Sequence, residues 1–184
     1  MRKVELKLNG VSEIVGSDQL GILLLTDIEQ QRQLSIVCEK KMAVQIELHY
    51  KQMPMTDLML PEVLCRLIKE SLHAELEITI TSLVDGQYKA LLYDKSSADS
   101  FNIRASDAVL LHVAGQVPLY IEETLMDRQS VSSSSSQMKG IHIPINTLSE
   151  DMLKDALNKA VFEENYEMAS KLRDELRRRE LENL

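Results

Sequence analysis

An internal repeat with a spacing of 67 residues constrains the fold of this chain more than any other feature. Shifting the sequence by 67 positions places residues 21–27 on 88–94 and residues 34–37 on 101–104, and the offset holds without a gap over 23–46. Such a repeat is typical of a supersecondary unit that is present twice. The pattern within each half predicts a strand, a hairpin, a second strand, a turn, a third strand and a helix.

Two further segments complete the predicted domain. Residues 58–72 have the apolar spacing of a helix, carried by Leu60, Leu64, Leu67, Ile68 and Leu72. Thr56 or Asp57 is expected to cap its N-terminus, and Pro61 is tolerated in a first helical turn. Residues 117–121 predict a short final strand. We therefore predict an α+β fold, with a mixed or antiparallel sheet of about seven strands and three helices.

The chain beyond residue 128 divides into a linker and a charged tail. Six of the eight residues over 130–137 are serines, and such a tract does not bury apolar area. Ser149 is the expected N-cap of two short helices that form an αα-hairpin, which is marginal alone and suited to docking on a protein. We predict a domain over 1–128, a Ser-rich flexible linker over 129–146 and a helical hairpin over 147–184.

The charge of the chain argues against one class of function. The formal net charge is −8, with −6 on residues 1–128 and −3 on residues 147–184, so no part is broadly basic. This argues against passive binding of nucleic acid through a basic surface. It is compatible with a nuclease, because carboxylates that hold cations can engage a phosphodiester. Aromatic residues are scarce, so base-stacking platforms are not expected.

Other signals bear on location and chemistry. No run of about 18 apolar residues is present, and the chain starts with a strand pattern rather than a secretory signal. Cys38 and Cys65 lack metal-ligand spacing and read as buried thiols. These features predict a cytoplasmic protein without a membrane span. The four histidines are expected at the surface or at helix ends. With only six glycines, a glycine-rich nucleotide loop is not expected, nor is an organic cofactor.

Two junctions that lead into predicted helices carry candidate site residues. At the later junction, the helix N-terminus and Arg104 would bind an anion, and Asp107, next to Ser106, would hold a divalent cation or orient a water. At the earlier junction, Thr56 and Asp57 would line the same polar cleft if the two turns lie together. The alternative is helix capping by these residues, with Arg104 in a local ion pair. The residues alone leave both interpretations open.

Several segments carry a resemblance to known domains. In the body they are residues 34–37, 54–58, 86–90 and 101–109. The strongest of them is 101–109, which looks like an Asp-Ala-Arg-Pro-Ser-Asp-Ala signature. It is followed by Pro118-Leu119-Tyr120, where the family has Pro-Ile-Tyr. On these residues, 1–128 resembles the bifunctional nuclease (BFN) domain. Residues 160–161, 164–169 and 172–176 make the tail similar to a UVR motif. BFN followed by UVR is a known bacterial arrangement.

The resemblance implies nuclease activity on DNA and RNA, a mixed α+β fold and frequent dimers, and the UVR motif implies docking to another protein. The chain also departs from the family. Residues 53–57 stand where the family has Arg-Pro-Leu-Thr-His-Asp, so that Arg and that His are missing. Ala105 and Ser35 replace prolines. Loss of the His and the Arg would remove a candidate general acid/base and a phosphate clamp.

Two functions follow as expectations. The first is a nuclease that hydrolyses phosphodiesters with Mg²⁺ or Mn²⁺, in which Asp107 orients the metal or a water and Arg104 contacts phosphate. Ser106, Thr56 and Asp57 would line the same cleft. The alternative is a catalytically weak or inactive adaptor, whose body forms a homodimer and whose tail over 147–184 recruits a repair or proteolysis partner.

Overall fold

The structure is a computed structural model that describes residues 2–13, 19–133 and 144–182. It divides into two compact units, which we describe separately. The body comprises residues 1–82 and 88–142, and the tail unit comprises 143–184 together with the turn residues 83–87. Most of the predicted linker, residues 134–143, lies outside the described residues.

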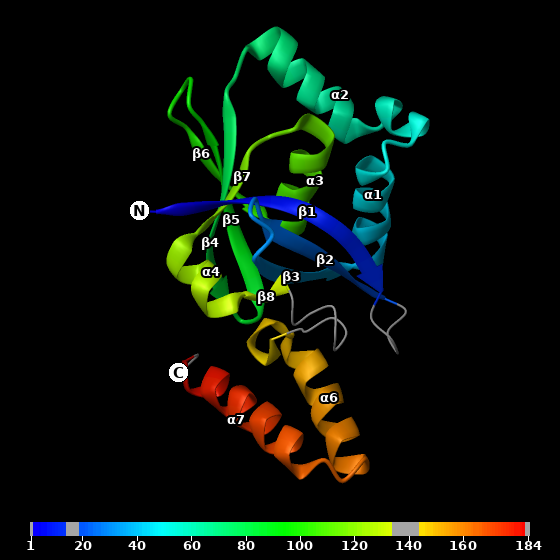
Figure 1. Ribbon diagram of the computed structural model, residues 1–184, viewed down its shortest axis with the longest axis vertical. Helices are drawn as coiled ribbons and strands as arrows, with labels where there is room; N and C mark the ends of the chain where they lie inside the picture. The colour runs from blue at the N-terminus through cyan, green and yellow to red at the C-terminus, as the bar shows by residue number, and fades with distance from the viewer. Residues whose placement is uncertain (1, 14–18, 134–143, 183–184) are drawn as a thin grey trace. The chain divides into compact units, whose positions relative to one another are not determined.

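The body is built on one mixed sheet of eight strands (Figure 1), which confirms the predicted α+β class. The strands are β1 (Lys3–Glu13), β2 (Leu20–Asp27), β3 (Arg32–Glu39), β4 (Leu76–Val84), β5 (Gln87–Asp94), β6 (Ser100–Arg104), β7 (Leu119–Glu122) and β8 (Val131–Ser132). Their order across the sheet is β6-β5-β4-β7-β1-β2-β3-β8. Strand β7 lies at the centre, antiparallel to β1 and parallel to β4, so the two predicted halves flank it on either side.

The strand ladders confirm the duplication. Leu25 pairs with Leu34 in the first half, and Leu92 pairs with Phe101 in the second, each 67 residues later. The same offset relates the other pairs of the two hairpins up to the end of β6. The helices then depart from it, because α1 (Lys40–Tyr50) and α3 (Ala105–Gly115) begin 65 residues apart. At the 67-residue offset, β3 extends two residues further than β6 at its C-terminal end, so α1 begins two residues later in its half than α3 does.

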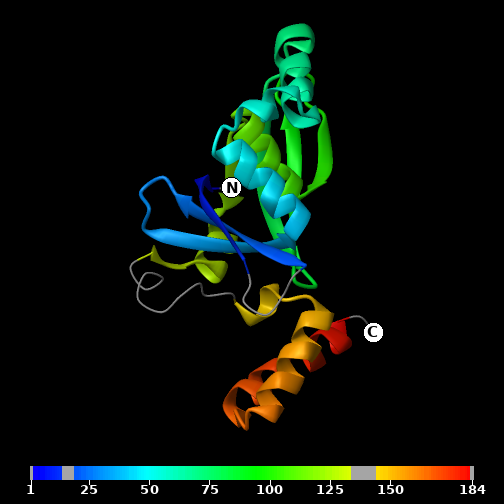
Figure 2. The same ribbon diagram turned by 90° about the vertical axis from the view of Figure 1, so that its right-hand side faces the viewer.

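The two duplicated helices form one layer over the sheet. Helix α1 packs on β1, β2 and β3, while α3 packs against α1 and touches β6, β7 and β3 (Figure 2). Aliphatic side chains from the central strands and α1 fill the space beneath them, as expected for a chain without Trp. The largest fully buried side chains of the body are those of Leu6, Ile22, Leu23, Leu25, Leu34, Ile46, Ile78, Ile80, Leu119, Ile121 and Met126.

The segment between the halves differs from its prediction in two ways. Thr56 and Asp57 do not cap a helix over 58–72, because they lie in a separate 3₁₀ helix, η1 (Pro54–Leu58). Helix α2 (Leu60–Leu67) starts after a break at Met59 and is followed by a π-helical turn, η2 (Ile68–Leu72). Pro61 lies in the first turn of α2 and has no N–H to donate four residues back, so it suits a helix start rather than a helix that continues from η1. The apolar stripe of this segment does not enter the core, and no residue of α2 is buried.

The chain after β7 adds elements that the sequence did not predict. Helix α4 (Glu123–Gln129) packs on β7 and β1, and β8 then pairs with the edge of β3. Val131 and Ser132 therefore belong to the sheet, although the predicted linker begins at 129. Among the described residues, no helix is long and apolar enough to cross a membrane.

The tail unit confirms the predicted αα-hairpin. A 3₁₀ turn, η3 (Ile145–Thr147), precedes α6 (Glu150–Phe162) and α7 (Tyr166–Glu182). Ser149 is the N-cap of α6, and its hydroxyl accepts a hydrogen bond of 3.3 Å from the backbone N–H of Met152, as expected. The hairpin encloses a small core of its own, made by Leu153, Ala160, Ala169 and Leu172.

Candidate functional site

A polar cavity of about 680 Å³ lies in the body where the C-terminal ends of the duplicated helices meet the inserted segment. One wall is the end of α1, the second is η1 with α2, and the third is the end of α3. The lining residues are His49, Gln52, Pro54, Thr56, Asp57, Glu62, Cys65, Arg66, Lys69, Val113, Ala114, Gly115 and Gln116. Both helices end in a glutamine with positive φ, Gln52 and Gln116, which turns the chain away and leaves the cavity open between them.

A buried histidine–carboxylate pair forms one side of the cavity. The Nε2 atom of His49 lies 2.6 Å from Oε2 of Glu62, and Nδ1 lies 2.8 Å from the carbonyl oxygen of Gln45. The His49 side chain is fully buried, whereas 15% of the Glu62 side chain is exposed. Glu62 is therefore the member of the pair that a bound molecule can reach, and His49 lies behind it.

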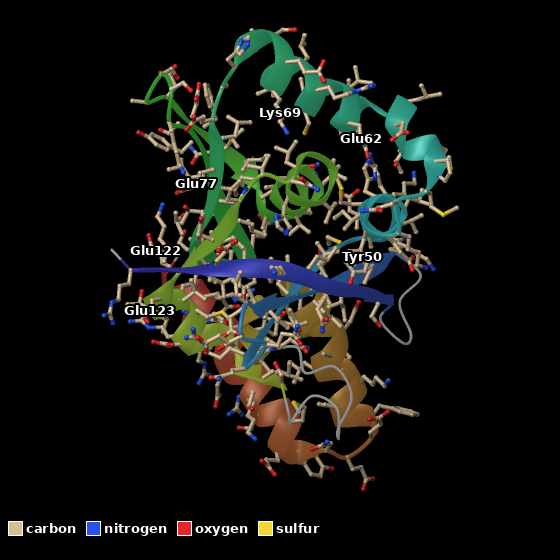
Figure 3. All side chains as sticks on the ribbon, turned by 45° about the horizontal axis from the view of Figure 1, so that its top comes forward. Tyr50, Glu62, Lys69, Glu77, Glu122 and Glu123 are labelled. Carbon is tan, nitrogen blue, oxygen red and sulfur yellow. The ribbon has the colours of Figure 1, made fainter. Side chains whose placement is uncertain are left out.

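Two cations face the same cavity, Arg66 from α2 and Lys69 from the η2 turn that follows it. The Nη2 atom of Arg66 donates a hydrogen bond of 3.1 Å to the carbonyl oxygen of Asp57. Within the described residues, neither Arg66 nor Lys69 forms an ion pair with a carboxylate. Figure 3 shows Glu62 and Lys69 on the side of α2 that faces the other two helices. Cationic groups without anionic partners are the groups that bind phosphate.

The cysteine in the cavity is not an activated nucleophile. Burial raises the pKa of the Cys65 thiol, and the neighbouring Glu62 carboxylate raises it further. A thiol in this environment stays protonated and behaves as a small apolar group. Its contact with α3 is close, because a Cβ atom on Gly115 would lie 2.5 Å from Sγ of Cys65. Cys65 therefore holds α2 against the end of α3.

The structure separates the candidate residues of the sequence into two groups. Thr56 and Asp57 line the cavity, although Thr56 is buried and its hydroxyl donates to the Met53 carbonyl oxygen at 2.7 Å. Arg104, Ser106 and Asp107 lie at the other end of α3, at its N-terminus. At 1.5 Å per residue, Asp107 is about 10 Å along the helix axis from the cavity wall at Ala114. The expectation of one shared cleft is therefore wrong.

Arg104 and Asp107 instead form a local ion pair. Nε and Nη2 of Arg104 lie 2.5 and 3.1 Å from the two carboxylate oxygens of Asp107, so the guanidinium engages both. Arg104 is also the N-cap residue of α3, and no side chain caps this helix. Both oxygens of Asp107 already have a cationic partner, which is the local ion pair that the sequence left open as the alternative.

The donor set does not fit a resident divalent metal ion. The described residues contain no group of three or more His, Cys, Asp and Glu side chains placed to hold a metal. Asp107 is paired with Arg104, and Oε2 of Glu62 is paired with His49. The carboxylates expected to hold Mg²⁺ or Mn²⁺ therefore do not converge.

Sequence reasoning missed four residues of the cavity: His49, Glu62, Arg66 and Lys69. A signal for three of them is present, because Glu62, Arg66 and Lys69 follow i, i+4, i+7 spacing and share one face of the segment. This face is opposite the leucine stripe on which the helix prediction rested. His49 is at a helix end, as expected, but it is buried and thirteen residues from its partner.

Comparison with known proteins gives one match, to a family model. No curated protein matches the chain. The model of the bifunctional nuclease domain matches residues 23–134, which include the cavity, both duplicated helices and most of the sheet. This match covers more than half of the 184 residues. The chain belongs to the bifunctional nuclease domain family.

Proposed function

We propose that the cavity between α1, α2 and α3 binds and hydrolyses a phosphodiester of DNA or RNA. The observation that carries this proposal is the arrangement on one face of α2 and η2: a carboxylate held by a buried histidine, with Arg66 and Lys69 beside it. The two cations would neutralise the phosphate oxygens, and the carboxylate would accept a proton from an attacking water. The cavity has the size of sites that enclose a small ligand, so a single-stranded segment fits the proposal better than an intact duplex.

The chain lacks the family Arg and His at residues 53–57, but the cavity contains one residue of each type. His49 and Arg66 reach the same cavity from other elements and provide the same two kinds of group. A divalent cation remains a prediction without a dedicated site in the described residues. Mg²⁺ commonly uses one or two carboxylates together with substrate phosphates, so an ion would arrive with the nucleic acid.

Cleavage of single-stranded DNA, RNA and duplex DNA by the purified protein tests the proposal, with Mg²⁺, with Mn²⁺ and with EDTA. The double variant Arg66→Ala/Lys69→Ala is expected to lower kcat/KM at least about a hundredfold, because two contacts to the anionic transition state are lost. Arg104→Ala, which removes an exposed cation outside the cavity, is the matched control and is expected to leave cleavage unchanged. Loss of cleavage in the control alone would move the site to the N-terminus of α3.

A second function, docking to a protein partner, is favoured by the tip of the tail hairpin. Phe162 is 88% exposed and Tyr166 is 69% exposed, on either side of the turn between α6 and α7. Large aromatic side chains at a helical tip are typical anchors of a protein interface. We propose that this tip binds the partner that a UVR-like hairpin implies. Phe162→Ser/Tyr166→Ser is expected to abolish capture of that partner while the far-UV circular dichroism stays unchanged.

The expected homodimer has its best support in the exposed leucines of η1 and of the outer face of α2. Leu58, Leu60 and Leu67 are 87%, 75% and 51% exposed, and a leucine surface of this kind is unfavourable in water. We propose that a second copy of the body covers it. Light scattering of the full chain is expected to give a dimer, and Leu60→Glu/Leu67→Glu a monomer. A monomeric wild-type chain would overturn this proposal.

A further inference from the structure

We infer that Glu62 is the proton acceptor of the cavity and that His49 is a positioning residue held behind it as an imidazolium. This inference rests on the proposed function of the cavity and assigns roles within it. It starts from the two contacts of the His49 ring, which between them fix where protons must lie.

The contacts of His49 require one proton on Nδ1 and another between Nε2 and Glu62. The partner of Nδ1 is the Gln45 carbonyl oxygen, which only accepts, so Nδ1 must carry a proton. The partner of Nε2 is a carboxylate oxygen at 2.6 Å, and two acceptors at this distance would repel each other. A second proton is therefore present, either on Nε2 or on Oε2.

The helix ends favour the charged arrangement, with both protons on His49. His49 lies in the last turn of α1, where the negative end of the helix dipole stabilises a cation. Glu62 lies in the first turn of α2, where the positive end stabilises an anion. Glu62 is also partly open to solvent and has Arg66 one turn further along the helix. All of these influences favour His49⁺ with Glu62⁻ over two neutral groups.

This arrangement assigns the steps of hydrolysis. Glu62 accepts a proton from a water whose oxygen forms the new bond to phosphorus, and the bond from phosphorus to the leaving oxygen breaks. The leaving oxygen takes a proton from solvent, and Glu62 later returns its own to solvent, so protons balance and nothing is oxidised or reduced. His49 donates its Nε2–H to Oε2 throughout, which fixes the carboxylate and leaves Oε1 for the water.

The charged neighbours of the pair lie on the wall made by η1, α2 and η2. Asp57 faces the cavity from η1, Cys65 and Arg66 face it from α2, and Lys69 faces it from η2. The wall from α3, Val113 to Gln116, carries no titratable side chain. The contact that fixes the Glu62 carboxylate is therefore the Nε2–H of His49, and kcat is expected to fall when the donor at this position is removed.

Three variants and one spectrum test the assignment. Glu62→Gln keeps the size of the side chain and removes the proton acceptor, so kcat is expected to drop about 100- to 10,000-fold. His49→Gln keeps a donor toward Oε2 and is expected to retain most of kcat, whereas His49→Leu removes that donor and is expected to lose most of it. Glu70→Gln, on the exposed turn after α2, is the control. Cleavage by Glu62→Gln at the wild-type rate would overturn the role of Glu62.

The protonation of His49 is measured independently of cleavage. In ¹⁵N-labelled full-length protein, both ring nitrogens of His49 are expected to carry a proton near neutral pH, with the signal assigned by its loss in His49→Gln. A singly protonated ring that persists down to about pH 5 would overturn the imidazolium. Failure of the proposed function is distinguishable, because it would abolish cleavage in every sample while leaving this spectrum as expected.

Discussion

The two halves of the body have the same strand register, but the side chains of their strands are buried to different extents. In the first half, most residues of β2 and β3 are buried on both faces of the hairpin. In the second half, β5 alternates between buried and exposed positions at its start, and β6 is exposed along nearly its whole length. Helix α1 packs on β2 and β3, whereas β6 is an edge strand of the described sheet.

This difference separates two kinds of information in a duplicated sequence. Which residue pairs with which across a hairpin is set by the apolar pattern and the turn, and both halves obey the same offset. How deeply each pair is buried depends on what covers the hairpin from outside. Equivalent residues of the two halves should therefore respond differently to the same substitution, and the predictions below test this from the largest expected effect to the smallest.

Leu34 and Phe101 occupy equivalent positions, yet Leu34 is fully buried and Phe101 is 58% exposed. Leu34→Ala is expected to lower the free energy of unfolding by about 2–5 kcal/mol, because it leaves a cavity in the core. Phe101→Ala is expected to cost less than about 1 kcal/mol. Urea titrations followed by circular dichroism measure both. Similar losses would mean that the β6 edge is covered in solution.

Gly21 of β2 and Tyr88 of β5 are also equivalent, and the glycine allows α1 to lie close to the sheet. A Cβ atom on Gly21 would lie 2.4 Å from the Cβ of Ala43, so Gly21→Ala is expected to cost about 1–3 kcal/mol through overpacking. Gly10→Ala, where no atom lies within 4 Å of the added Cβ, is the control and should change the free energy by less than about 0.5 kcal/mol. Ala43→Gly in the Gly21→Ala background should recover part of the loss.

Asp27 closes the turn of the first hairpin as Asp94 closes that of the second. Burial opposes ionisation of Asp27, but hydrogen bonds from Arg32 and from the backbone N–H of Gln31 hold its pKa below the ordinary value. Because its pKa is lowered, the ionised Asp27 side chain stabilises the fold. This stabilisation is fully present above the unfolded-state pKa of about 3.9 and is lost as the pH falls below that value. Asp27→Asn is therefore expected to cost about 2 kcal/mol at pH 7 and much less near pH 3.

Asp94→Asn is the matched control for that prediction. Its carboxylate receives hydrogen bonds from the backbone N–H of Ser96 at 2.8 Å and from the Ser97 hydroxyl at 3.0 Å, and within the described residues it has no arginine partner like that of Asp27. A smaller loss with a weaker pH dependence is expected in thermal melts over the same pH range. Equal behaviour of the two variants would show that the Arg32 contact adds nothing to the turn.

A substitution at Tyr88 is expected to change the free energy of unfolding least, and to raise it rather than lower it. Its hydroxyl is buried without a hydrogen-bond partner among the described residues, and burial raises its pKa. Tyr88→Phe is expected to raise the free energy of unfolding by up to about 1 kcal/mol, because an unsatisfied polar group is removed. Destabilisation in the same urea titrations would mean that the hydroxyl has a partner in solution.

Several features of this protein were determined by the sequence alone because they depend on neighbours along the chain. The spacing of 67 residues predicted the duplicated unit, and the ladders confirm it down to individual pairs. The pair Asp85-Gly86 is typical of a two-residue hairpin turn, and both residues have positive φ, as such a turn requires. Ser149 and the apolar spacing after it predicted the tail hairpin. Capping, turn chemistry and periodicity are local, so a sequence carries them directly.

Only the tertiary structure decided where the candidate site lies. Helical spacing shows that Glu62, Arg66 and Lys69 share a face, but not whether that face or the leucine face of α2 points inward. In the structure, α2 packs on α3 and turns its polar face toward the ends of α1 and α3. His49 then meets Glu62 across thirteen residues, while Asp107 pairs with its own neighbour. Which helix ends converge is a property of packing, and the pattern within one helix does not contain it.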